Sequence, residues 1–283
     1  MSSNRPMATV IGMGRAGSNF LYYQLRKHPK VSVPALTEVS FYSRFFSRGF
    51  DWYKKQFKGD TSQVGIDVSA NYYLQDNFVH RVNSFDPNTK IILGVRKPSN
   101  WILSYFQQMR TFDFSVNNME KFITEFEWDD REKVRHINMS DNYLPNQIEL
   151  YKKEFKGRLL VYDFAYLHNH SVELLQQIEH FLEIPSFFNE ANYEDIKVNA
   201  SGRKNNRFLL NIISNDRFRL FVNDFLPQSF IDKLRTWYVR SGSPKKSVKV
   251  EHDPLHKELA DKLLASQDEY YQEMFKEKGV LIY

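Results

Sequence analysis

A glycine-rich turn near the N-terminus constrains the fold of this chain more than any other feature. The apolar run 8–11 leads into Gly12-Met13-Gly14-Arg15-Ala16-Gly17-Ser18, which has the pattern Gly-x-Gly-x-x-Gly. Such a turn between a strand and a helix presents backbone N–H groups to an anion, and the helix N-terminus adds a partial positive charge of about half a unit. The sequence therefore predicts a phosphate-binding loop at the start of an α/β fold.

The rest of the chain alternates between strand-like apolar runs and helical patterns, which predicts a central parallel sheet flanked by helices. The predicted strands are 8–12, 65–68, 90–95 and 158–162, and the predicted helices are 18–27, 98–110 and 172–182. We interpret residues 112–140, which are polar and aromatic, as an insertion or lid over the site. Residues 241–252 resemble a linker before a terminal helix at about 253–276. The sequence predicts a single domain over residues 1–283.

Composition excludes several classes of protein. The chain has no cysteine, so disulfides, thiolate metal sites and a cysteine nucleophile are excluded. The net charge of +5 suits an anionic ligand, but the charge is not massed in one block as nucleic-acid binding requires. Residues 1–6 are polar and no apolar run approaches the ~20 residues that span a bilayer. We therefore expect a cytoplasmic protein with no membrane span and no nucleic-acid partner.

The glycine pattern by itself also fits an NAD(P)-dependent oxidoreductase. That interpretation requires a second strand that ends in an acidic residue about 20 positions further on, to bind the ribose. Glu38 lies at that distance, but the candidate strand 31–36 has Pro34 in its middle. Proline removes a hydrogen-bond donor from the sheet, so it is disfavoured in a central strand. The oxidoreductase remains an alternative at this point.

Five segments together resemble PAPS-dependent sulfotransferases of the glycan-modifying and bacterial type, over about residues 8–210. They are the loop Gly12–Asn19 followed by His28-Pro29-Lys30-Val31, then Thr37-Glu38-Val39-Ser40-Phe41-Tyr42 (similar to KEVHFF), Val95-Arg96-Lys97-Pro98 with Ser104 (similar to RxPxxxxxS), Phe181-Leu182-Glu183-Ile184-Pro185 (similar to FLGLP) and Asn199-Ala200-Ser201-Gly202-Arg203. The resemblance implies a P-loop-like sulfotransferase fold and transfer of a sulfuryl group from PAPS to a hydroxyl or amine, with PAP as the product nucleotide.

PAPS carries a 5′-phosphosulfate and a 3′-phosphate, so the resemblance implies two anion sites. Arg96, at a strand end, can bind a phosphate with a two-pronged charge-assisted fork, and we expect the hydroxyl of Ser104, about two turns into the next helix, to face it. The implied donor-binding residues are Gly14, Arg15, Ala16, Gly17, Ser18, Asn19, Arg96, Ser104, Ser201 and Arg203.

The resemblance also implies roles for two catalytic residues in an in-line displacement. Glu38 is the candidate general base that deprotonates the acceptor, and the aromatic residues after it would desolvate its carboxylate. Arg15 would neutralise the charge that develops on the leaving phosphate. A sulfuryl group carries less negative charge than a phosphoryl group, so we expect no metal ion in the site.

Three positions depart from the family pattern. Arg15 stands where many relatives have lysine, Ser40 where glycan-modifying members often have histidine, and Val68 where many have lysine. The last two positions usually face the acceptor, so the departures weaken the analogy with a glycan acceptor and leave a small molecule open. A catalytically degenerate protein that binds a nucleotide or a glycan is therefore the second alternative.

Overall fold

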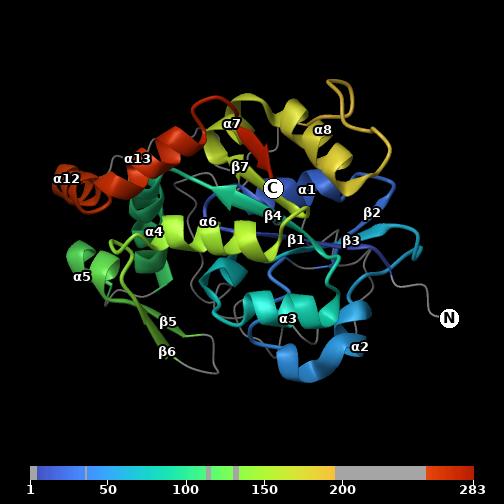
Figure 1. The fold of residues 1–283 in the computed structure, drawn as a ribbon, viewed down its shortest axis with the longest axis horizontal. Coiled ribbons are helices and arrows are strands. Elements are labelled where there is room, and N and C mark those ends of the chain that lie inside the picture. The colour runs from blue at the N-terminus through green and yellow to red at the C-terminus, as the bar shows by residue number, and fades with distance from the viewer. Residues whose placement is uncertain (1–4, 36, 113–115, 130–133, 195–252) are drawn as a thin grey trace.

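A six-stranded sheet forms the centre of the molecule, in a computed structural model that describes residues 5–35, 37–112, 116–129, 134–194 and 253–283 (Figure 1). Its strand order is β2-β3-β1-β4-β7-β8. The strands are β1 (Met7–Gly12), β2 (Val31–Ser32), β3 (Val64–Val68), β4 (Lys90–Val95), β7 (Leu159–Asp163) and β8 (Val280–Ile282). All neighbours pair in parallel except β7 and β8, which are antiparallel. The central strands therefore end at one edge, where ligands of open α/β sheets bind.

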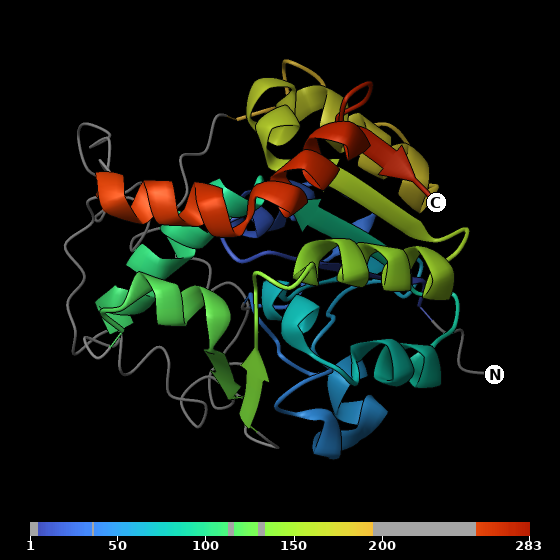
Figure 2. The same ribbon diagram turned by 60° about the vertical axis from the view of Figure 1, so that its left-hand side comes forward.

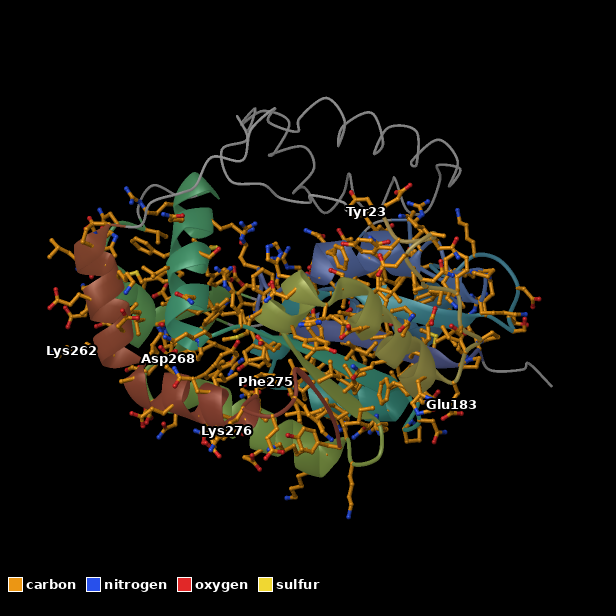
Figure 3. The ribbon with its side chains drawn as sticks, turned by 90° about the horizontal axis from the view of Figure 1, so that it is seen from above. Tyr23, Glu183, Lys262, Asp268, Phe275 and Lys276 are labelled. Atoms are coloured by element: carbon orange, nitrogen blue, oxygen red, sulfur yellow. The ribbon has the colours of Figure 1, made fainter. Side chains whose placement is uncertain are left out.

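Helices cover both faces of this sheet (Figures 1 and 2). The described helices are α1 (Ser18–Leu25), α2 (Gly49–Lys54), α3 (Phe78–Phe85), α4 (Pro98–Phe112), α5 (Met119–Thr124), α6 (Tyr143–Glu154), α7 (Phe164–Asn169), α8 (Ser171–Leu182), α12 (Pro254–Leu263) and α13 (Ala265–Met274), with short 3₁₀ turns η1 (Phe46–Arg48) and η2 (Ala70–Leu74). In Figure 3, Lys262 marks α12 and Asp268 marks α13, both beside α4. Within the described part of the chain, no helix is both long and apolar enough to cross a bilayer.

Alternating side chains on the strands divide the core into two layers. Leu93 of β4 packs with α3, α4 and α6 on one face, whereas its neighbour Ile92 packs with α1 and α8 on the other. Both side chains are fully buried, as are Ile11 and Val10 of β1 on the corresponding faces. Burying one such side chain contributes about 1.5–3 kcal/mol to stability, so the sheet is held firmly from both sides.

Most predicted strands and helices are confirmed within one or two residues, and three differences have clear causes. The sheet is not wholly parallel, because the chain end returns beside β7, where Tyr283 N donates to Leu159 O and Gly157 N donates to Tyr283 O. The predicted terminal helix is two helices separated at Leu264, whose φ of −112° interrupts the helical path. Strand β2 stops at Ser32, two residues before Pro34.

The predicted insertion 112–140 contains α5 and a hairpin of β5 (Phe126–Asp129) and β6 (Val134–Ile137). Arg135 anchors the hairpin through an ion pair with Asp76 and a hydrogen bond to the carbonyl of Leu74. The ring of Phe126 contacts Tyr105 of α4 at a centroid distance of 5.8 Å. The described part of the segment thus lies against η2 and α4, and its role as a lid stays a prediction.

Candidate functional site

The glycine loop between β1 and α1 adopts left-handed backbone angles at three positions. They are Gly12 (φ 137°), Arg15 (φ 75°) and Gly17 (φ 92°). A Cβ on Gly12 would collide with the carbonyl group of Gly94 on β4, and a Cβ on Gly17 would lie 2.7 Å from Leu167 Cδ1. Gly17 is also the N-cap of α1 and has no side chain to accept the N–H groups of the first turn. These groups are therefore available to an anion.

Side chains from three other elements hold the loop by its carbonyl oxygens. Trp101 Nε1 donates to Gly14 O (2.8 Å), Arg96 Nη1 to Arg15 O (3.3 Å) and Tyr162 OH to Ala16 O (2.9 Å). Three successive carbonyls are thus engaged by α4, the end of β4 and β7. This arrangement fixes the loop and satisfies these three acceptors within the protein. Met13 N donates to Gly94 O and Ala16 N to Met13 O, so the loop amides that a ligand can use are the other ones, next to the start of α1.

Two arginines lie side by side at this loop. Burial lowers the pKa of both guanidinium groups, and the charge of Arg15 lowers the pKa of Arg96 further. Among the described residues, neither arginine forms an ion pair with a carboxylate. Placing two like charges together in a half-buried site is unfavourable unless an anion compensates them. The pair therefore indicates a site for a strongly anionic ligand.

Ser104 lies at this site, but its partner differs from the one expected. Its hydroxyl accepts a hydrogen bond from Arg15 Nε at 3.3 Å and was predicted to face Arg96. The guanidinium of Arg96 lies instead 4.8 Å from the ring centre of Phe164, at the start of α7. The turn of α4 directs Ser104 toward the glycine loop, so Ser104 connects to the loop arginine.

Glu38 lies in the loop after β2, in a left-handed conformation with φ 57°. Its backbone N–H donates to Val68 O (2.8 Å), and its Oε1 accepts from Ala70 N (3.2 Å), so the carboxylate is fixed at the end of β3. Tyr105 links this position to the glycine loop. Its ring edge lies 3.5 Å from the point where Gly14 would carry a Cβ, and the Glu38 charge adds to the effect of burial in raising the pKa of Tyr105. Glu38 therefore belongs to the same site as the loop.

The buried carboxyl group of Asp67 is connected to the Glu38 loop by hydrogen bonds. Asp67 of β3 is fully buried and accepts hydrogen bonds from Ser69 Oγ (2.7 Å), Tyr72 OH (2.7 Å) and Tyr53 OH (3.1 Å). Burial raises the pKa of Asp67 to about 6, although the three hydroxyl donors act in the opposite direction. Ser69 Oγ in turn accepts from Ser40 N at 3.3 Å, two residues after Glu38.

The other predicted positions fall into three groups. Ser18 and Asn19 form the first turn of α1, next to the loop. Ser201 and Arg203 lie outside the described residues. Val68, one of the departures from the family pattern, is 1% exposed and packs in the core with α1 and α8, not toward an acceptor.

Sequence reasoning missed Trp101, Tyr105 and Tyr162, although each contacts the loop or lies beside Glu38. Trp101 and Tyr105 are one turn apart on α4 and their rings stack at a centroid distance of 5.4 Å. The spacing of Trp101 and Tyr105 is common among core residues and indicates no function by itself. The one sequence signal for them is that two aromatic residues four positions apart follow shortly after Arg96, the predicted phosphate-binding arginine.

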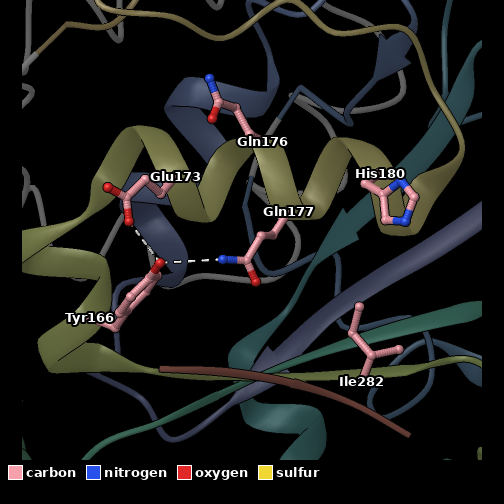
Figure 4. Close-up of a pocket in the computed structure, with 6 residues that line it drawn as sticks. All are labelled: Tyr166, Glu173, Gln176, Gln177, His180 and Ile282. Carbon is pink, nitrogen blue, oxygen red and sulfur yellow. Dashed lines mark hydrogen bonds between the residues drawn. The ribbon is translucent and has the colours of Figure 1, made fainter. Parts of the chain in front are cut away.

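A separate hollow of about 430 Å³ is lined by α8, by Tyr166 of α7 and by Ile282 of β8 (Figure 4). In this hollow, Tyr166 OH donates to Glu173 Oε2 (2.9 Å) and accepts from Gln177 Nε2 (3.3 Å). None of its lining residues is among the predicted site residues. Among the described residues, no group of three or more His, Cys, Asp and Glu is arranged to hold a metal ion.

Comparison with known proteins shows the family to which the chain belongs. Residues 6–274 match the family model described as the sulfotransferase domain. The chain belongs to this family. A crystal structure of a sulfotransferase from Alicyclobacillus acidocaldarius is similar over 67% of this chain and 86% of that one, with 20% identity and a TM-score of 0.54. Mouse sulfotransferase SULT7A1 complexed with PAP matches over 98% and 89%, with 12% identity and a TM-score of 0.50. At these identities the structures establish the sulfotransferase fold.

Curated sulfotransferases share shorter stretches of sequence. Mouse bifunctional heparan sulfate N-deacetylase/N-sulfotransferase 4 is 25% identical over 65% of this chain and 23% of its own length. Human heparan sulfate glucosamine 3-O-sulfotransferase 6 is 28% identical over 36% and 30%, and membrane-associated sulfotransferase kil1 of Dictyostelium discoideum is 31% identical over 36% and 22%. The matched part of this chain thus spans less than a third of the length of each of these relatives.

Proposed function

We propose that this protein transfers a sulfuryl group from PAPS to a hydroxyl or amine of an acceptor. The observation that carries the proposal is the pair Arg15 and Arg96, two adjacent half-buried cations that form no ion pair with a carboxylate in the described chain. A donor with a phosphosulfate and a separate 3′-phosphate would compensate both charges. Family membership and the similarity to a sulfotransferase complexed with PAP support the same donor.

The amides at the start of α1 would bind the 5′-phosphosulfate. Ser18 and Asn19 are within the first turn and can add side-chain donors. Arg96 at the end of β4 would bind the 3′-phosphate, and the Arg15–Ser104 hydrogen bond would direct the Arg15 guanidinium to the bridging oxygen of the donor. Ser201 and Arg203 complete the proposed donor site. No step requires a metal ion.

Transfer would proceed by in-line displacement. Glu38 takes the proton of the acceptor group while the acceptor oxygen or nitrogen forms a bond to sulfur. The bond between sulfur and the bridging oxygen breaks, and the electron pair stays on the phosphate of PAP, where Arg15 and the loop amides stabilise it. The Ala70 N–H keeps the Glu38 carboxylate in place at the end of β3.

A glycan is the acceptor that the relatives favour, since two of those named above carry heparan sulfate in their names. Val68 is buried and would not contact this acceptor, so the positive charge that many relatives carry at this position would have to come from another residue. A small-molecule hydroxyl remains an alternative.

The strand order argues against a dinucleotide-dependent oxidoreductase. In the dinucleotide-binding fold the strand that follows the first helix lies next to the first strand. Here β3 separates β2 from β1, and β2 lies at the edge of the sheet. The acidic residue after β2 is held at the end of β3, so it is not at the position where that fold binds a ribose.

The decisive experiment compares Glu38→Gln with the wild-type protein in sulfate transfer and in PAP binding. We expect the turnover rate to fall at least about a hundredfold, the usual contribution of a general base, while the dissociation constant of PAP stays unchanged. Glu183→Gln, a change at the exposed end of α8, is the matched control and should transfer normally. If Glu38→Gln lost sulfate transfer and PAP binding to the same extent, Glu38 would not be the general base. If the wild-type protein bound PAP but transferred no sulfate, the protein would be a catalytically degenerate binding protein.

A further inference from the structure

Three side chains on one turn of α13 each bond to the start of another helix. Gln267 Oε1 accepts from Leu144 N (2.9 Å) at the start of α6, and Asp268 Oδ1 accepts from Ser99 N (3.0 Å) at the start of α4. Tyr271 OH donates to Asp163 Oδ1, and the same oxygen accepts from Ala165 N as the N-cap of α7. Figure 3 labels Asp268 on α13, beside α4. Gln267 and Asp268 are both buried, so these are caps supplied from a distant part of the chain.

Two of these contacts flank Arg96. Asp268 Oδ2 pairs with Lys97 at 3.2 Å, directly after Arg96 in the chain. Tyr271 fixes Asp163, and the next residue, Phe164, supplies the ring that lies against the Arg96 guanidinium. Arg96 and Tyr271 are also close enough that each influences the pKa of the other. Burial and the Asp163 carboxylate raise the pKa of Tyr271, so its hydroxyl remains a neutral donor at physiological pH.

We infer that Asp268 and Tyr271 are positioning residues for the donor site: they hold the start of α4 and the start of α7 so that Arg96 faces the 3′-phosphate. This inference rests on the proposed function of Arg96. Without the Tyr271 hydroxyl, the Asp163 carboxylate keeps its bond to Ala165 N but loses its contact with α13. The adjacent Phe164 ring, which lies against the Arg96 guanidinium, is then held less firmly. Helix α13, more than a hundred residues away in the sequence, thus preorganises the anion site at Arg96 before the nucleotide binds.

Tyr271→Phe tests the inference because it removes one hydroxyl and keeps the ring. We expect the dissociation constant of PAP, measured by calorimetry, to rise about five- to tenfold, the effect of one lost hydrogen bond. The KM for PAPS should rise by the same factor, and kcat at saturating PAPS should stay unchanged. Tyr270→Phe is the matched control, since the adjacent tyrosine donates to the exposed Glu149 and should bind PAP normally.

Two more variants, Asp268→Ala and Arg96→Ala, distinguish a failure of this inference from a failure of the proposed function. Asp268→Ala should give the same rise in KM without a fall in kcat. The inference would be overturned if Tyr271→Phe and Asp268→Ala both bound PAP with normal affinity. It would also be overturned if the two variants lowered Tm and kcat without changing KM, because that is the effect of a helix with a purely structural role. If Arg96→Ala loses PAP affinity in that case, the proposed function survives without the inference. If Arg96→Ala binds PAP normally, the donor assignment and the inference are both wrong.

Discussion

At the scale of single residues, Arg15 has the most constrained environment in the site. A non-glycine residue with φ 75° carries strain of about 1–3 kcal/mol, which persists only where the surroundings fix it. Here Arg96 holds the carbonyl of Arg15 and Ser104 holds its side chain. The strained backbone and the hydrogen bond to Ser104 together direct the guanidinium to one place, which is what stabilisation of a leaving group requires.

Arg15→Ala should therefore lower kcat by about 10²–10³, the usual effect of removing one group that stabilises developing charge. Arg15→Lys retains the positive charge and matches the residue common among relatives, so we expect its kcat to lie within about tenfold of wild type. Steady-state sulfate transfer measures both, with Arg110→Ala at the exposed end of α4 as control. A kcat within twofold of wild type in Arg15→Ala would show that the loop amides alone stabilise the leaving phosphate.

The sequence predicts the chain position of the site residues better than it predicts their partners. The glycine loop, Glu38 and Arg96 could be found because each follows a recognisable strand end or motif. The partner of Ser104 could not, because it depends on how α4 rotates against the loop. Tyr162, 146 residues from the carbonyl that it holds, gives no local signal at all.

At the scale of elements, Asp67 joins three parts of the fold that lie next to the site. It belongs to β3, and its carboxyl group accepts hydrogen bonds from Tyr53 on α2 and Tyr72 on η2. Because folding raises the pKa of Asp67 from 3.8 to about 6, the folded state favours the protonated form. The contribution of this group to stability is fully present below about pH 4 and is lost as the pH rises through about 6.

The free energy of unfolding should therefore contain a contribution that falls by roughly 3 kcal/mol between about pH 4 and pH 6. Asp67→Asn, which stays neutral, should remove this contribution and raise the stability at pH 8 above that of wild type. Denaturant unfolding at pH 4, 6 and 8 measures it, with Asp141→Asn at an exposed position as control. An unchanged pH slope in Asp67→Asn would mean that the three hydroxyl donors keep the carboxylate ionised in the folded protein.

Some elements carry a clear local signal in the sequence and others do not. Strand 90–95 contains the continuous apolar run 91–95 and helix 98–110 begins at a proline, so both could be located from the sequence. Strand β8 has three residues and forms only because β7 is available to pair with it. Strand β5 alternates buried and exposed residues over four positions, too few to distinguish it from a loop by pattern.

At the scale of the whole molecule, positive charge is concentrated where parallel strands end. Arg15 and Arg96 follow the ends of β1 and β4, and the hairpin of β5 and β6 and the helices α12 and α13 lie along one side of the sheet (Figure 2). The unliganded protein keeps two cations together there at a cost in stability. An anion that binds between them would remove this cost in addition to forming its own hydrogen bonds.

A nucleotide with two separate phosphate groups, such as PAP, should therefore stabilise the folded protein. PAP present at about 100 times its dissociation constant should add about 2.7 kcal/mol to the free energy of unfolding, which corresponds to a rise in Tm of roughly 5–10 °C. The rise should shrink as the salt concentration increases, because part of the binding energy is electrostatic. NAD and NADP at equal concentration are the comparison, since they are the cofactors of the alternative oxidoreductase. A larger rise in Tm with NADP than with PAP would favour the oxidoreductase, whereas a rise with PAP that disappears in Arg96→Ala would assign the effect to this site.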